Sequence, residues 1–145
     1  MNKRILLVDD DTDDTELFCE AVAALHSDVQ CDIAVDGRDA LEKLEGYKAA
    51  LPDLMILDMN MPRMNGWECL KALKANERYR HIPVIVYSTS DRGYVSAIAE
   101  DLGATGFFTK PNDYQQLAGI VRKIVESLND GSISTIGDKL HAVNG

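Results

Sequence analysis

The sequence is poor in the residues that build metal clusters and disulfide frameworks. Its 3 cysteines and 3 histidines are scattered over 145 residues, and no C-x-x-C pair is present. Zinc sites and disulfide scaffolds both require closely spaced ligands or paired cysteines. We therefore predict no zinc site, and we expect Cys19, Cys31 and Cys69 to be reduced.

Long hydrophobic runs and an excess of positive charge are missing as well. No stretch approaches the roughly 18 to 20 apolar residues that span a bilayer, and the apolar run at 5–8 is too short for a signal-peptide core. With 15 Lys and Arg against 24 Asp and Glu, the formal net charge is −9, which disfavours attraction to nucleic acid. We expect a cytoplasmic protein that binds neither membrane nor nucleic acid.

What the sequence does contain is a regular alternation of short apolar runs and amphipathic segments. The runs lie at residues 5–8, 29–35, 54–57, 84–87 and 107–108. Continuous runs of this length predict strands that are covered on both faces. Between them, apolar residues recur at helical spacing, as in the set Leu17, Phe18, Ala21, Val22 and Leu25. Five such strand–helix units predict a flavodoxin-like, doubly wound α/β fold with a five-stranded parallel sheet in the order 2-1-3-4-5 and five helices.

Capping residues and the loss of periodicity predict where the elements and the domain end. Capping pairs predict the starts of the first, third and fifth helices: Asp13 with Glu16, Asn65 with Glu68, and Asn112 with Gln115. Residues 129–145 lose helical periodicity and are rich in small polar residues. We therefore expect one domain over residues 1–128, followed by a C-terminal tail that is either disordered or docked on a partner.

Acidic residues follow the first and third predicted strands. Asp9, Asp10 and Asp11 come after the first strand, and Asp58 ends the third. Ligands in open α/β sheets bind at the carboxyl ends of the strands, near the point where the strand order reverses. Carboxylates gathered there repel one another, and Mg²⁺ with its oxygen ligands resolves that conflict. For the acidic triplet alone, a solvated loop at a helix start is the commoner explanation.

A hydroxyl lies at the end of the fourth predicted strand, and an ammonium follows the fifth. The fourth strand ends at Ser88, and Lys110 follows the fifth. A hydroxyl donates hydrogen bonds to phosphoryl oxygens, and an ammonium neutralises their charge. Each residue alone is ordinary, as a helix cap or a surface charge. Together with the acids at the other strand ends, they indicate a phosphoryl-binding site.

This ordered set resembles the response-regulator receiver domains of bacterial two-component signalling. The matching pieces are Val8-Asp9-Asp10, Asp58-Met59-Asn60-Met61-Pro62 with Gly66, Pro83 leading into Ser88, Gly103-Ala104, and Lys110-Pro111. The resemblance covers residues 3 to about 128. The stretches 11–14 and 77–81 further resemble the sub-group that is paired with phytochrome-type sensor kinases.

The resemblance implies a phosphoacceptor and a cofactor. Asp58 would accept the phosphoryl group, with Mg²⁺ as the metal. Asp10, Asp58 and the backbone carbonyl of Asn60 would be its ligands, and Asp9 would assist through water. The phosphoryl group would come from a sensor histidine kinase or a phosphotransfer protein.

The resemblance also implies which residues couple phosphorylation to a conformational change. Ser88 and Lys110 would contact the phosphoryl group, and Ser88 and Phe107 would form the conformational switch. The changed surface would be the fourth helix, the fifth strand and the fifth helix, read by an unidentified protein target, with the chain a monomer or a phosphorylation-dependent homodimer. Thr89 departs from the Ala or Gly usual in the family, so the lifetime of the phosphorylated state does not follow from the resemblance.

Two other functions fit the sequence less well. An aspartyl-phosphate phosphatase also attacks with a strand-end aspartate, but it carries a second Asp two residues later. This sequence has Asn60 there, and an amide cannot act as a general acid. A flavin- or dinucleotide-binding module needs a glycine-rich first turn, where three aspartates stand. We therefore expect a stand-alone, single-domain response regulator that is not an enzyme but assists its own phosphorylation and dephosphorylation.

Overall fold

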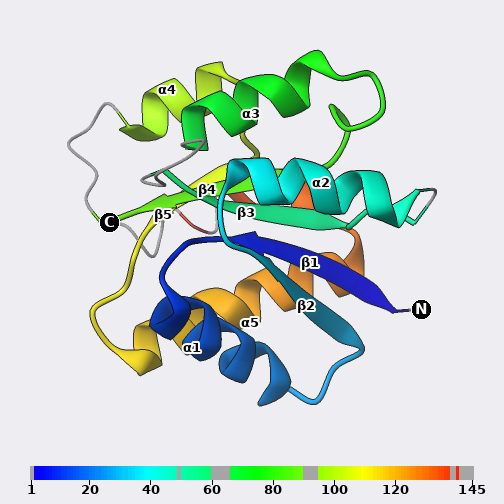
Figure 1. Cartoon of the computed structure of the whole chain (residues 1–145). Helices are drawn as coiled ribbons and strands as arrows, with labels where there is room; N and C mark the ends of the chain where they lie inside the picture. The colour runs from blue at the N-terminus through cyan, green and yellow to red at the C-terminus, as the bar shows by residue number, and fades with distance from the viewer. Residues whose placement is uncertain (1, 49, 60–65, 90–94, 138–139, 141–145) are drawn as a thin grey trace.

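The computed structural model describes residues 2–48, 50–59, 66–89, 95–137 and 140. Its centre is a five-stranded parallel sheet in the order β2-β1-β3-β4-β5 (Figure 1). The strands are β1 Lys3–Val8, β2 Val29–Ala34, β3 Leu54–Asp58, β4 Val84–Ser88 and β5 Gly106–Thr109. The predicted flavodoxin-like sheet and its strand order are confirmed.

Helices cover both faces of the sheet, so the molecule has three layers (Figure 1). One face carries α1 and α5, and the other carries α2, α3 and α4. The helices are α1 Thr12–Ala23, α2 Gly37–Tyr47, α3 Gly66–Ala75, α4 Val95–Asp101 and α5 Tyr114–Asp130. Among the described residues, none of these helices combines the length and apolar character that crossing a bilayer requires.

The central strands β3 and β4 are buried because helices cover them from both sides, whereas the edge strand β2, also predicted to be covered on both faces, keeps exposed residues. Every residue of β3 and β4 is buried, as the continuous apolar runs predict. Successive side chains point to opposite faces: Ile5 and Leu7 pack against α1 and α5, whereas Leu6 and Val8 pack on the other side. The sheet therefore divides the interior into two hydrophobic cores.

Two helices begin one or two residues away from the predicted positions. Asp11 caps α1, because its carboxylate accepts hydrogen bonds from the backbone N–H groups of Asp13 and Asp14 at 3.0 and 3.2 Å. Asp113 caps α5, accepting from the N–H of Gln116 at 2.8 Å. An acidic side chain just ahead of the first free N–H groups satisfies donors that the helix leaves unpaired. Where several cap-forming residues are adjacent, local pattern alone does not choose among them.

The predicted cap of the third helix lies partly outside the part of the chain that the structure describes. Asn65 is not described, and α3 begins at Gly66. Glu68 lies in the first turn, where a negative charge is favourable. The capping pair at this helix therefore stays a prediction.

The C-terminal segment differs most from the prediction. Helix α5 continues to Asp130, and a short 3-10 helix follows at Ile133–Thr135. Ile136 and Leu140 are fully buried in the core of the α1–α5 layer. The described residues of this segment thus pack on the chain's own core. Neither predicted alternative, disorder or docking on a partner, describes this packing. The apolar spacing of residues 133, 136 and 140 was the available signal.

Candidate functional site

Three carboxylates meet at the carboxyl ends of β1 and β3. The two strands are paired in parallel, with Val8 opposite Leu57, so the residues that follow them are neighbours. Asp9, Asp10 and Asp58 each place an oxygen within 4.8 Å of the others. Asp9 and Asp58 are buried and Asp10 is exposed. The structure therefore brings the predicted acidic residues together.

This donor set fits a small, hard divalent cation. Buried carboxylates this close repel one another, and a cation bound by their oxygens removes the repulsion. Oxygen-only donors of this kind suit Mg²⁺ or a similar ion. Asn60, whose carbonyl was predicted as a further ligand, lies outside the described residues, so its role stays a prediction.

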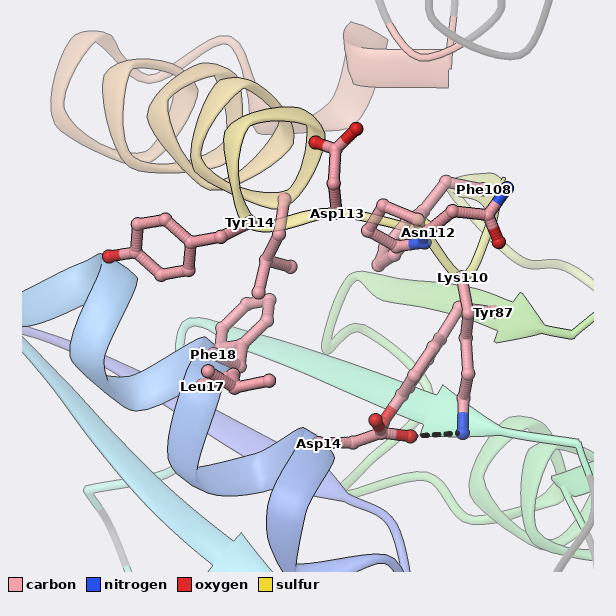
Figure 2. Close-up of a pocket in the computed structure, with 11 residues that line it drawn as sticks. Asp14, Leu17, Phe18, Tyr87, Phe108, Lys110, Asn112, Asp113 and Tyr114 are labelled. Atoms are coloured by element: carbon pink, nitrogen blue, oxygen red, sulfur yellow. Dashed lines mark hydrogen bonds and ion pairs between the residues drawn. The ribbon is translucent and has the colours of Figure 1, made fainter.

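Lys110 reaches into the acidic cluster from the end of β5. Its ammonium nitrogen lies 2.9 Å from a carboxylate oxygen of Asp14, 3.3 Å from one of Asp9 and 3.5 Å from one of Asp58. The Asp14 contact is visible in Figure 2. Burial disfavours the charged form, but the bond to Asp14 and the charges of Asp9 and Asp58 outweigh it, so the pKa of Lys110 is raised. Lys110 is held as a cation at the site.

Tyr87 is a site residue that sequence reasoning missed. Its hydroxyl donates a hydrogen bond to Asp9 Oδ2 inside the protein. Its ring stacks on Phe108 at a centroid distance of 5.3 Å, and the Lys110 nitrogen lies 4.9 Å from the ring centroid. Burial and the neighbouring Asp9 charge raise the pKa of Tyr87, so the hydroxyl keeps its proton. The signal in the sequence was a tyrosine in a buried strand, because a buried tyrosine hydroxyl needs a hydrogen-bond partner.

Asp14 was missed too, because an acidic residue in the first turn of a helix is ordinary. The helix dipole stabilises a carboxylate in the first turn whichever neighbour the side chain faces, so the sequence does not indicate its partner. Only the fold shows that it faces Lys110, 96 residues along the chain. The pair joins α1 to the loop after β5.

Ser88 and Phe107 are the two residues of the predicted switch. Ser88 is the last residue of β4 and is buried, and its carbonyl oxygen accepts the backbone N–H of Lys110 at 2.7 Å. Phe107 is 8% exposed and packs in the core beneath α3 and α4, on the opposite face from Phe108. The switching roles of both residues stay predictions.

Gly66 packs directly under the strand that carries Asp58. A Cβ at this position would lie 2.5 Å from the carbonyl oxygen of Asp58, which no side chain could accommodate without a shift of the backbone. The N–H of Gly66 also donates to the carbonyl oxygen of Met59 at 3.3 Å. Glycine is therefore needed here for close approach to the end of β3.

A cavity of about 140 Å³ adjoins Lys110 between α1 and the start of α5 (Figure 2). Asp14, Tyr87 and Lys110 form its polar side. Leu17, one of the apolar residues at helical spacing in α1, is 42% exposed and lines the same cavity. The helical stripe of α1 is therefore wider than the surface that the sheet covers.

Comparisons with known proteins agree with this geometry. The family model described as response regulator receiver domain matches residues 5–122. Protein PilG of Pseudomonas aeruginosa is 30% identical over 117 residues, which cover 79% of this chain and 84% of PilG. Other curated relatives are longer, and the chain spans 28% and 49% of the length of two of them.

Solved structures of similar proteins have the same fold. The phosphorylated cyanobacterial phytochrome response regulator RcpA is 32% identical, with a TM-score of 0.82 over 90% of this chain and 96% of that chain. The Mn²⁺-bound form of response regulator Rcp1 is 32% identical, with a TM-score of 0.76 over 86% and 92% of the two chains. With the acidic cluster and the lysine in place at the strand ends, the chain belongs to the response regulator receiver domain family.

Proposed function

We propose that this protein accepts a phosphoryl group on Asp58 and passes on a signal through a changed surface. The observation that carries the proposal is the setting of Asp58. It is 3% exposed, it ends β3 beside the carboxylates of Asp9 and Asp10, and the Lys110 ammonium lies 3.5 Å away. A carboxylate nucleophile flanked by a cation-binding acid pair and a fixed ammonium suits phosphoryl transfer.

The proposed reaction is an in-line displacement. An Asp58 carboxylate oxygen attacks the phosphorus of a phosphohistidine on a sensor kinase or phosphotransfer protein, and the O–P bond forms as the P–N bond breaks. The imidazole leaves with the electron pair of that bond, and the product is an acyl phosphate that water later hydrolyses. In this reaction the chain is a phosphoacceptor that assists its own phosphorylation and dephosphorylation.

Mg²⁺ is the cation we propose for the acidic cluster. Asp10, Asp58 and the Asn60 carbonyl would bind it, with Asp9 assisting through water. The ion would neutralise charge on the transferred oxygens. The similar response regulator Rcp1 has a Mn²⁺-bound form, which supports a divalent cation in this chain as well.

Lys110 and Ser88 are proposed to contact the phosphoryl group and so favour the signalling conformation. A hydrogen bond from Ser88 to a charged oxygen contributes about 1.5 to 3 kcal/mol, whereas inverting a 1:99 equilibrium needs about 5.5 kcal/mol. Ser88 alone is therefore insufficient, and the Lys110 contact and repacking of Phe107 would supply the rest. The surface that changes would be α4, β5 and α5, read by a protein target, with the chain a monomer or a phosphorylation-dependent dimer.

The source of the phosphoryl group is proposed to be a phytochrome-type sensor kinase. The similarity to RcpA, a phytochrome response regulator, supports this assignment. The match of the receiver-domain family model to residues 5–122 argues against the alternative function, an aspartyl-phosphate phosphatase. Asn60, which lies outside the described residues, disfavours it because an amide cannot act as a general acid.

The proposal is tested by incubating the protein with acetyl phosphate, with and without Mg²⁺, and measuring the intact mass. We expect a Mg²⁺-dependent gain of one phosphoryl group in the wild type and none in Asp58→Asn. Asp28→Asn, at an exposed aspartate just before β2, is the matched control and should gain one phosphoryl group as the wild type does. A wild type that gains nothing, or an unchanged gain in Asp58→Asn, would contradict the proposal.

A further inference from the structure

Lys110 has three N–H donors and three carboxylates around its nitrogen. The contact with Asp14 is the shortest at 2.9 Å, and the contact with the proposed phosphoacceptor Asp58 is the longest at 3.5 Å. Asp9, at 3.3 Å, lies between them. Asp14 is absent from the group of carboxylates whose oxygens meet within 4.8 Å, which contains Asp9, Asp10 and Asp58. Asp14 thus binds the lysine from outside the cation site.

We propose that Asp14 is a positioning residue that draws the Lys110 ammonium away from Asp58 and holds it at the rim of the site. The inference rests on the proposed function, because it concerns how Lys110 and a divalent cation share the site. An ammonium and a metal ion compete for the oxygens of Asp9 and Asp58. Because Asp14 binds the ammonium and lies outside the cation site, it lowers the free-energy cost of displacing Lys110 from Asp9 and Asp58 when the metal binds.

The surroundings fix both partners of this pair. The backbone N–H of Asp14 donates to Asp11 Oδ1 at 3.2 Å, so the cap of α1 fixes the backbone position from which the Asp14 side chain extends. The backbone N–H of Lys110 donates to the carbonyl oxygen of Ser88 at 2.7 Å. The Tyr87 ring lies beside the ammonium, which leaves the lysine chain extended toward α1 (Figure 2). The side chain of Asp14 is 39% exposed and that of Lys110 is 16% exposed, so Asp14 binds the ammonium from the more exposed side of the pair.

Without Asp14, two effects act in the same direction on metal affinity. The ammonium would pair more closely with Asp9 and Asp58, and a metal ion would have to displace it. The local negative charge that attracts a cation would also fall by one. Loss of a partner that orients a metal ligand typically weakens metal binding by about 10- to 100-fold. Because Asp14 is half-exposed and acts through Lys110, we expect the lower end of that range.

The test is a Mg²⁺ titration with no phosphodonor present, in which the fluorescence of Trp67 reports metal binding. Trp67 is the single tryptophan and follows Gly66, which packs on the carbonyl of Asp58. We expect Asp14→Ala to raise the Kd for Mg²⁺ by about tenfold. Asp13→Ala removes the same charge from the neighbouring, exposed position and should raise it by less than about twofold. Asp14→Glu keeps the charge and should restore most of the affinity.

A second pair of variants separates contact with the lysine from a general charge effect. In a Lys110→Met background, Asp14→Ala should change the Kd no more than Asp13→Ala does. Equal effects of the two alanine variants in the wild-type background, or a full effect of Asp14→Ala without Lys110, would overturn the inference. The acetyl phosphate experiment tests the proposed function separately: if the wild type is phosphorylated while Asp14→Ala binds Mg²⁺ normally, only the role of Asp14 fails.

Discussion

The two ends of the central sheet differ in what they bury. At the carboxyl ends of the strands, Asp9 and Asp58 are almost inaccessible to solvent and share one lysine. At the amino end of β5, Ile136 and Leu140 from the C-terminal segment are fully buried among apolar side chains. Buried apolar groups stabilise the fold, whereas gathered like charges cost stability unless a cation is present. The same sheet thus carries its reactive groups at one end and part of its stabilising core at the other.

Of the variants at the two ends of the sheet, Leu140→Ala should change the free energy of unfolding most. Truncating a fully buried leucine removes apolar contacts and leaves a cavity, at a cost of about 2 to 5 kcal/mol in the free energy of unfolding. Urea unfolding measures it, and acetyl phosphate labelling below the unfolding transition should match the wild type. Ile98→Ala, at a side chain that is 42% exposed, is the control. Equal losses in the two variants would show that the C-terminal segment does not contribute to the core.

Tyr87→Phe should give the next largest effect, at the charged end. It removes the hydroxyl that donates to Asp9, and hydrogen bonds to charged groups contribute about 1.5 to 3 kcal/mol. We expect that loss in urea unfolding with EDTA, and a smaller loss with saturating Mg²⁺, because the cation then shares the Asp9 charge. Tyr114→Phe, at an exposed ring, is the control. A loss no greater than in that control would mean that the hydroxyl does not stabilise Asp9.

Asp10→Asn should have the smallest effect and the opposite sign. Its carboxylate adds a third negative charge within 4.8 Å of Asp9 and Asp58. Removing it should raise the free energy of unfolding in EDTA by about 1 kcal/mol, while the stabilisation by added Mg²⁺ is lost. Asp28→Asn, away from the cluster, should change neither quantity. If Asp10→Asn were less stable than the wild type without metal, repulsion at this end of the sheet would be refuted.

Much of the fold and of the site could be predicted from the sequence. Continuous apolar runs and helical stripes are local patterns, and they predicted all five strands and their parallel order. Parallel strands of a doubly wound sheet present their carboxyl ends together, so the residues that follow them had to be neighbours. That rule was enough to bring Asp9, Asp58, Ser88 and Lys110 to one edge.

Local sequence patterns are therefore sufficient to predict the layers of this protein and the acidic edge of its sheet. Three contacts could not be predicted in this way: Asp14 meets Lys110, Tyr87 meets Asp9 across 78 residues, and Leu140 packs beside Gly106 at the start of β5. Each of these contacts depends on how far a particular side chain reaches across the packed layers. Periodicity reports which face a residue occupies, but it carries no information on the partner found there.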